Sequence, residues 1–303
     1  MKLIITGLSG FVGQNFLGYL KGRGVDVQDL SLRDMSWESK IALKADAIIH
    51  LAGKAHDTNR DVNINEYFEI NRDLTIRLFD KFLKSDIKDF FYFSSVKAVA
   101  DIVTGVLIED VEGKPKTPYG QSKYEAEQYL LSQKLPQGRR LFIVRPCMIH
   151  GPGNKGNLNL LYKVVEKGLP WPLATFKNER SYLSVNNLNF LIYEMLRKDS
   201  LTSGVYNLSD DQSISTNHLI EIISNTLEKK AKLWNIPSCL IKSAVRLGSL
   251  IPFTPLNSER LKKITESYVV SNKKIKEALG IKKLPLTTEE GLINTIQSFK
   301  NNK

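Results

Sequence analysis

The sequence has few of the residues that build metal centres and disulfide frameworks. Its 303 residues include two cysteines, Cys147 and Cys239, and four histidines. Two cysteines cannot form a disulfide framework or a structural zinc site, and no histidine shows the spacing of a metal ligand. We therefore expect no metal site. A reducing compartment fits this cysteine usage best, so we predict a cytoplasmic protein.

Long apolar runs are also missing. No apolar stretch reaches the roughly 18 residues that a transmembrane helix needs. The nearest candidate, residues 236–253, carries Lys242 and Arg246 and is broken by Pro237 and Pro252. We expect a helix that covers a substrate lobe there, with contact to a membrane surface as the alternative. The chain opens on a strand-like run without room for a signal peptide. Because no apolar run is long enough, no integral membrane segment is expected.

Acidic residues are fewer than basic ones. The sequence has 32 Asp and Glu against 43 Lys and Arg, and its formal net charge is +11. Such an excess favours an anionic partner. The cations are scattered along the chain, with only short clusters such as Lys229-Lys230 and Lys273-Lys274. No basic module with interleaved aromatic residues is present. The pattern is typical of a basic enzyme with a phosphorylated small-molecule partner, and not of a nucleic-acid-binding protein.

What the first half of the chain does contain is a regular alternation of apolar strand-like runs and amphipathic stretches. We predict strands at 2–6, 25–30, 46–52, 90–95 and 139–145, and helices at 11–21, 64–83 and 119–131. This order predicts an α/β fold with a doubly wound parallel (Rossmann) sheet. Glycine and proline become frequent after residue 145. We expect a dinucleotide-binding domain over 1–165 and a smaller C-terminal α/β substrate lobe over 166–303, with late segments returning to the sheet.

Glycines mark the turn between the first predicted strand and helix, in TGLSGFVG (6–13). They permit a tight turn, close approach of the backbone to a pyrophosphate and close packing of helix on strand. The helix N-terminus adds free N–H groups and a positive dipole. A simple tight turn is the alternative interpretation. We predict an NAD or NADP site formed by Gly7, Ser9, Gly10, Phe11, Val12 and Gly13.

The end of the second predicted strand bears on the choice of cofactor. An acidic residue there commonly binds the ribose 2′-hydroxyl of NAD. Ser31 occupies that place, and Arg33 lies just beyond it. A serine and an arginine suit the 2′-phosphate of NADP better, although Asp29 and Asp34 flank the site. Both cofactors stay open, with a slight preference for NADP.

A tyrosine and a lysine four residues apart, Tyr119 and Lys123, lie on one face of a predicted helix. A nearby ammonium stabilises a phenolate and lowers the tyrosine pKa from about 10. Such a tyrosine can exchange a proton with a sugar hydroxyl during hydride transfer. The spacing alone also fits an ordinary solvated face. Ser94 and Ser95 end the fourth strand at the ligand-binding edge, where Ser95 can bond the same oxygen and Ser94 fits a strand cap.

Together these residues resemble the extended short-chain dehydrogenases of the NAD-dependent epimerase/dehydratase family. That family modifies nucleotide sugars and includes UDP-hexose 4-epimerases and UDP-4-keto-sugar reductases. The motifs that carry the resemblance are TGLSGFVG (6–13), HLAG (50–53), Asn71 before Thr75, FSSVKAVAD (93–101), TPYGQSKYEAE (117–127), RPCMIHGPG (145–153) and RSYLSVNNL (180–188).

The resemblance implies roles for individual residues. Tyr119 would be the catalytic acid/base, Lys123 its activator and ribose anchor, and Ser95 the partner of the substrate hydroxyl. Further cofactor contacts would come from Leu51, Ala52, Gly53, Asn71 and Pro146.

The expected substrate is a UDP-sugar. The arginine that matches Arg180 binds the nucleotide diphosphate in similar enzymes, and a bidentate guanidinium suits that task. A surface salt bridge is the alternative for Arg180. Arg260 is a candidate second clamp. Asn157 and Leu158 open a helix after GPGNKG, so their amides can cradle a phosphate.

Departures from the family pattern narrow the expected chemistry. The residues after Ser95, VKAVA (96–100), contain no carboxylate where dehydratases carry an Asp-Glu pair, so dehydration is disfavoured. The resemblance is closest to bacterial enzymes acting on UDP-linked N-acetylated or 6-deoxy hexoses for surface polysaccharides. We expect 4-epimerase or 4-keto-reductase chemistry at C4. A catalytically idle NAD(P)-binding sensor or scaffold is the alternative, and dimerisation of relatives leaves a homodimer open.

Overall fold

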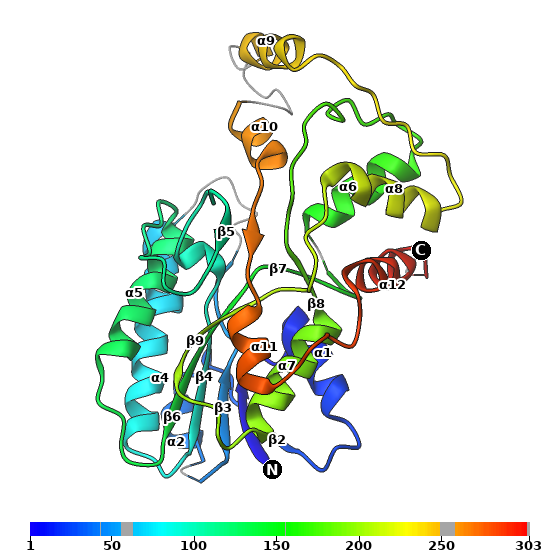
Figure 1. Cartoon of the computed structure of the whole chain (residues 1–303). Helices are drawn as coiled ribbons and strands as arrows, with labels where there is room; N and C mark the ends of the chain where they lie inside the picture. The colour runs from blue at the N-terminus through cyan, green and yellow to red at the C-terminus, as the bar shows by residue number, and fades with distance from the viewer. Residues whose placement is uncertain (43, 56–62, 155, 249–257, 302–303) are drawn as a thin grey trace.

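A six-stranded parallel sheet forms the centre of the protein (Figure 1). The computed structural model describes residues 1–42, 44–55, 63–154, 156–248 and 258–301. The strand order β2-β1-β3-β4-β6-β9 confirms the predicted doubly wound sheet, in which the connections cross over between parallel neighbours. The strands are β1 (Lys2–Thr6), β2 (Asp26–Asp29), β3 (Ala47–His50), β4 (Asp89–Phe93), β6 (Arg140–Pro146) and β9 (Gly204–Leu208).

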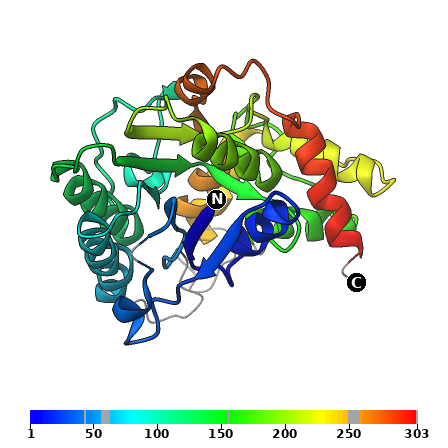
Figure 2. The same ribbon diagram turned by 90° about the horizontal axis from the view of Figure 1, so that it is seen from below.

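Helices cover both faces of this sheet. Figures 1 and 2 show α4 (Leu74–Leu83) and α5 (Pro118–Ser132) side by side on one face. On the other face lie α1 (Phe11–Leu20), α7 (Val185–Arg197) and α11 (Lys273–Leu279). Two of these helices and β9 come from the second half of the chain. Late segments of the chain therefore complete the sheet and its cover.

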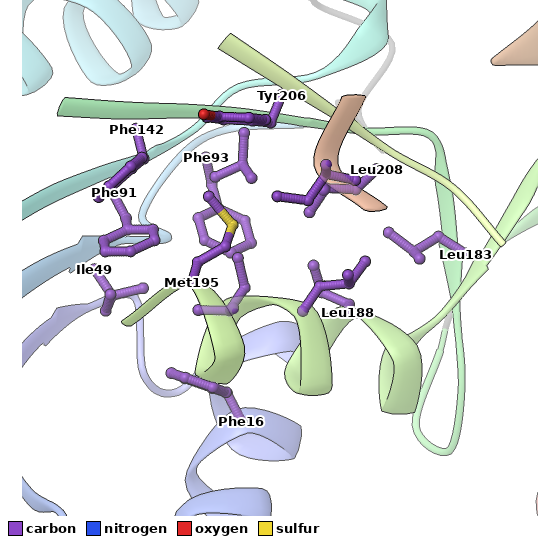
Figure 3. Close-up of a cluster of buried hydrophobic side chains, with 14 of the residues drawn as sticks. Phe16, Ile49, Phe91, Phe93, Phe142, Leu183, Leu188, Met195, Tyr206 and Leu208 are labelled. Carbon is purple, nitrogen blue, oxygen red and sulfur yellow. The ribbon is translucent and has the colours of Figure 1, made fainter. Parts of the chain in front are cut away.

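The strands supply both faces of the core because successive side chains of a strand point in opposite directions. Phe91 of β4 packs toward α1 and α7, where Figure 3 shows it beside Ile49 and Phe142 and facing Met195. Phe90, its neighbour in β4, packs instead among side chains of α4 and α5. This two-sided burial explains why β4 is aromatic from Phe90 to Phe93 and does not alternate with polar residues there.

A second apolar cluster forms the smaller lobe. It joins α6 (Asn157–Glu166), α8 (Thr216–Thr226) and α12 (Thr288–Asn301), beside the short pair of β7 (Met148–His150) and β8 (Tyr182–Ser184). The remaining elements are η2 (Val96–Ala98), α2 (Trp37–Lys40), α9 (Ser238–Gly248), α10 (Ser258–Thr265), β5 (Val106–Leu107) and β10 (Val269–Val270). Among the described residues, no helix is long and apolar enough to span a bilayer. The domain division near residue 165 remains a proposal, and the packing of α6 favours counting that helix with the lobe.

The helix predicted over 64–83 is not uniform. It runs as α3 (Ile64–Phe68), the π-helical turn η1 (Glu69–Asp73) and α4. The π turn carries Asn71, which is fully buried. Periodicity cannot reveal such a turn, since one wider turn leaves the apolar pattern on both sides intact. Turns of this kind commonly occur at functional sites.

A buried ion pair fastens α5 to β6. Arg145 is 5% exposed and Glu127 0%, and an Nη2 of Arg145 lies 2.5 Å from Oε2 of Glu127. The Nε of the same arginine donates to both carboxylate oxygens at 3.0 and 3.1 Å. The Nη1 of Arg145 donates to the carbonyl of Glu109 at 3.3 Å, which connects the ion pair to the segment that follows β5. The geometry is bidentate, so the pair holds three segments in a fixed arrangement.

The first prediction concerns the packing of α1 on the turn after β1. A Cβ added to Gly13 would lie 2.6 Å from backbone atoms of Gly7 and Leu8, whereas one added to Gly18 meets nothing within 4 Å. We expect Gly13→Ala to lower the free energy of unfolding by about 1–3 kcal/mol through overpacking. Gly18→Ala, in the same helix, should raise it by roughly 0.5–1 kcal/mol. Urea denaturation measures both, and equal effects would contradict the packing described.

The second prediction concerns the Arg145–Glu127 pair. Glu127→Ala or Arg145→Ala alone should cost about 3–5 kcal/mol of unfolding free energy, because each leaves a buried charge without its partner. The double variant should cost less than the sum by about 0.5–3 kcal/mol. Denaturant titration of the four proteins gives this coupling. The exposed pair Lys114–Glu112, 3.1 Å apart, is the control, and Glu112→Ala should change stability by less than about 1 kcal/mol. Strict additivity at Arg145 and Glu127 would refute the coupling.

Candidate active site

The turn between β1 and α1 lies directly against the end of β3. Gly7 has a φ of +71°, and Gly10 donates its N–H to the Gly7 carbonyl at 3.0 Å. A Cβ on Gly7 would lie 2.7 Å from the backbone nitrogen of Ala52, so only glycine permits this approach. Hydrogen bonds of the Thr6 hydroxyl connect the ends of β1 and β3 at this contact. The Thr6 hydroxyl lies 2.7 Å from Nδ1 of His50 and accepts the N–H of Ala52 at 3.2 Å.

The end of β3 also meets the π turn and α5. A Cβ on Gly53 would lie 3.0 Å from both Oδ1 of Asn71 and Nζ of Lys123. The Asn71 amide group donates to the carbonyl of Lys54 at 2.9 Å and to the hydroxyl of Ser122 at 3.0 Å. Its oxygen accepts the N–H of Lys54 at 2.8 Å. Three residues predicted for one site, Gly53, Asn71 and Lys123, are therefore brought together.

Tyr119 lies in the first turn of α5. Thr117 caps this helix by accepting the N–H of Gly120 at 3.2 Å, and Pro118 supplies a preset φ at the first position. A Cβ on Gly120 would lie 2.5 Å from the carbonyl of Lys97, so the helix start packs against η2, immediately after Ser95. The Ser95 hydroxyl lies close enough to the phenol of Tyr119 to lower its pKa. The structure thus joins the two side chains predicted to share one substrate oxygen.

Burial dominates the acid–base behaviour of this pair. It raises the pKa of Tyr119 above its usual 10.0, against the lowering effect of the Ser95 hydrogen bond. It lowers the pKa of Lys123 to about 8, against the raising effect of the Glu127 carboxylate. The Lys123 ammonium donates to the carbonyl of Phe93 at 2.8 Å. The predicted lowering of the Tyr119 pKa by Lys123 is therefore wrong for this geometry, since desolvation dominates and Lys123 is not among the groups that shift this pKa.

A buried carboxylate behind the site was missed by sequence reasoning. The hydroxyl of Ser94 donates to Glu127, the partner of Arg145. Glu127 follows Lys123 by four residues and Tyr119 by eight, so helical spacing already placed all three on one face. This contact gives Ser94 a definite role, because it fixes the end of β4 that carries Ser95.

The residues predicted to select the cofactor lie just past β2. The N–H of Leu30 donates to the carbonyl of Ile5 at 2.9 Å, so sheet pairing continues up to Ser31. Ser31 and Arg33 are both exposed. Asp34 is engaged elsewhere, since its carboxylate binds Lys40 and accepts the N–H of Ser36 at 2.9 Å. The other predicted cofactor residues follow the carboxyl ends of β1 and β3 or end β6, namely Ser9, Phe11, Val12, Leu51 and Pro146.

The residues predicted to bind the substrate are placed less completely. Arg180 exchanges backbone hydrogen bonds with Ile214 at 3.0 and 2.9 Å. Burial raises the pKa of Tyr182 to about 12, and the positive charge of Arg180 opposes this rise. Leu158 is buried in the lobe, with its amide in the first turn of α6. The side chains of Asn157 and Arg260 lie outside the described residues, although their backbones begin α6 and belong to α10.

Tyr268 connects the substrate side to the catalytic side and had no signal in the sequence. Its hydroxyl donates to the carbonyl of Ala100 at 2.7 Å and to that of Val96 at 3.1 Å. Its backbone carbonyl accepts the N–H of Ser181 at 2.9 Å, next to Arg180. The segment that follows Ser95 is therefore tied to the segment that carries Arg180, just ahead of β8.

Known proteins resemble this chain in sequence and in fold. The chain is 28% identical over 324 residues to a UDP-glucose 4-epimerase of Vibrio cholerae, covering 98% of this chain and 95% of that protein. Its fold matches the structure of MoeE5 in complex with UDP-glucuronic acid and NAD, with a TM-score of 0.77, 16% identity and full coverage of both chains. It also matches RMD from Pseudomonas aeruginosa complexed with NADPH, with a TM-score of 0.73, 20% identity and 99% coverage of each chain.

The family itself follows from a match over most of the sheet-forming part of the chain. The model of the NAD dependent epimerase/dehydratase family covers residues 3–209, which span all six strands of the central sheet except part of β1. This range includes the glycine turn, Ser95, Tyr119 and Lys123. The match confirms the predicted relationship, and the chain belongs to the NAD-dependent epimerase/dehydratase family.

Proposed function

We propose that this protein is an NAD(P)-dependent enzyme acting at C4 of a UDP-hexose, as a 4-epimerase or a 4-keto-sugar reductase. The observation that carries the proposal is the placement of the Ser95 hydroxyl beside the Tyr119 phenol, with the Lys123 ammonium of the same helix on the Phe93 carbonyl at the carboxyl end of β4. Ligands bind at this edge in folds of this kind. The Vibrio cholerae relative, named a UDP-glucose 4-epimerase, supports the same position on the sugar. We infer a role in making surface-polysaccharide precursors.

The glycine turn fits a dinucleotide. A Cβ on Gly10 would lie 3.2 Å from the Gly7 carbonyl, so side chains there would fill the space in which the backbone meets a pyrophosphate. The start of α1 directs its free N–H groups to the same place. When bound, the nicotinamide accepts or returns the hydride of C4. Gly7, Gly10, Gly13 and the Ala52-Gly53 backbone would hold this cofactor.

The side chains of the site would handle the proton and the orientation of the sugar. Ser95 and Tyr119 would both bond O4, and Tyr119 would take the O4 proton as C4 is oxidised and return it on reduction. Lys123, protonated below about pH 8, would bind the cofactor ribose, and its positive charge would oppose the rise that burial causes in the Tyr119 pKa. To do so its ammonium would exchange the Phe93 carbonyl for the ribose hydroxyls. Arg180 would bind the diphosphate.

Removing one hydroxyl tests the proposed acid/base. Tyr119→Phe keeps the ring and its edge contact with Tyr67 but removes the proton carrier. We expect kcat to fall by about 10²–10⁴-fold, the usual contribution of general acid–base catalysis. Turnover would be followed by NMR with UDP-GlcNAc and with its 4-keto-6-deoxy derivative. Tyr129→Phe is the control. It removes a hydroxyl from the same helix, and that hydroxyl bonds Asp80 at 2.8 Å. Undiminished activity of Tyr119→Phe would refute the mechanism.

The same assay separates the two candidate reactions. A 4-epimerase interconverts the UDP-hexose epimers with no added cofactor, because the hydride returns to the same sugar. A reductase consumes one NADPH for each 4-keto sugar. Mass spectrometry of ligands carried through purification would add evidence, since tightly retained NAD with cofactor-free turnover would eliminate the reductase.

For the cofactor we propose a preference for NADP. Arg33 and Ser31 are exposed at the end of β2, while Asp34 is engaged by Lys40. An arginine–phosphate hydrogen bond contributes about 1.5–3 kcal/mol, so Arg33→Ala should weaken NADPH binding by roughly tenfold or more. NADH binding by the same variant should change little and serves as the internal control. Fluorescence titration measures both affinities. Equal losses, or tighter binding of NADH by the unaltered protein, would contradict the preference.

A further inference from the structure

The smaller lobe carries large apolar side chains that face outward. Leu160 on α6 is 62% exposed, and Leu169, just after that helix, is 52% exposed. Trp234, which precedes α9, is 55% exposed, and Leu240 on α9 is 60% exposed. None of them takes part in the proposed chemistry. We call the surface formed by residues 160–169 and 229–246 the Trp234 surface.

Backbone pairing makes the central part of this surface continuous. The N–H of Trp171 donates to the carbonyl of Lys232 at 2.8 Å, and the N–H of Trp234 donates to the carbonyl of Trp171 at 2.9 Å. Trp171 is buried, and its bridge partner Leu233 packs against the same apolar cluster. In extended chain the neighbours of Leu233 point the other way, so Lys232 and Trp234 face solvent.

Lysine contacts join this strip to the end of α6. The Lys232 ammonium donates to the carbonyl of Gly168 at 2.9 Å, and that of Lys229 donates to the carbonyl of Glu166. Leu169 follows directly in the chain. On α9, Ile241 and Val245 are buried while Leu240 is exposed.

The charge of the Trp234 surface is strongly positive. Its exposed cations are Lys163, Lys167, Lys229, Lys230, Lys232, Lys242 and Arg246. Within residues 160–169 and 229–246 the only acidic residue is the half-buried Glu166, and the exposed Glu228 lies directly before them in the chain. Large apolar side chains therefore stand singly among many lysines.

We propose that the Trp234 surface docks this protein on the anionic face of a lipid bilayer. An exposed tryptophan and leucines enter the boundary between head groups and acyl chains, while lysines beside them attract anionic lipids. A protein partner fits less well, because lysine is depleted in the cores of protein interfaces. Single-stranded nucleic acid fits less well too, since stacking needs successive aromatic side chains and the leucines offer none.

The intrinsic fluorescence of the protein gives a direct test. Trp37 and Trp171 are 2% and 8% exposed, so Trp234 is the tryptophan whose surroundings change on docking. Vesicles of phosphatidylglycerol with phosphatidylcholine would be compared with vesicles of phosphatidylcholine alone, without sugar or cofactor. We expect cosedimentation and a blue shift with the anionic vesicles, at least about tenfold tighter binding than to neutral ones, and weakening as salt rises.

Charge-matched variants locate the contact. Lys163→Glu with Lys230→Glu should weaken binding to anionic vesicles by at least about tenfold, because both cations would face the lipid. Lys273→Glu with Lys274→Glu makes the same change in net charge on α11 and should have less than about a threefold effect. Trp234→Ala should weaken binding and abolish the blue shift.

Three outcomes would overturn the proposal: no binding to the anionic vesicles, equal losses in the two double variants, or a duplex DNA probe bound where vesicles are not. The measurements contain no substrate, so their failure leaves the proposed C4 chemistry untouched. Conversely, loss of that chemistry would leave docking intact.

Discussion

Parallel pairing of the strands is the constraint on which the rest of this structure depends. Because β1, β3, β4 and β6 run in one direction, their carboxyl ends meet at one edge of the sheet. Segments that are far apart in sequence are thereby brought into contact, such as Gly53 after β3 and Lys123 of α5. The edge is closely packed at Gly7 and Gly53. A Cβ added there would lie 2.7 Å from a backbone atom at Gly7 and 3.0 Å from side-chain atoms at Gly53. The proposed cofactor site follows from that compactness.

The sequence was most informative where local patterns decide the structure. The strands and the glycine turn followed from apolar runs and from residue types that a βα turn requires. The helix predicted over 119–131 starts one residue after the observed start of α5 at Pro118, and Tyr119 and Lys123 were correctly placed on one helix. Such features depend on neighbours within a few positions, so a single chain is enough to predict them.

Features that depend on distant partners could not be predicted. The π turn carries Asn71, whose side chain bonds Lys54 and Ser122, 17 and 51 residues away. The pKa of Tyr119 depends on how many atoms surround it, and spacing along a helix does not reveal burial. Tyr268 reaches Ala100 from 168 residues away. In each case the deciding term is desolvation or a long-range hydrogen bond, both of which arise only after the chain has folded.

The His50 contact has a consequence for how the proposed site responds to acidity. His50 joins Thr6 of β1 to Thr75 of α4, with its ring nitrogens 2.7 and 2.9 Å from the two hydroxyls. Burial lowers the pKa of this imidazole to about 3. The ring therefore stays uncharged throughout the range in which an ordinary histidine gains a proton. The tether beneath the glycine turn keeps the same hydrogen bonds in mildly acidic and neutral surroundings, so the cradle it supports has no protonation switch of its own.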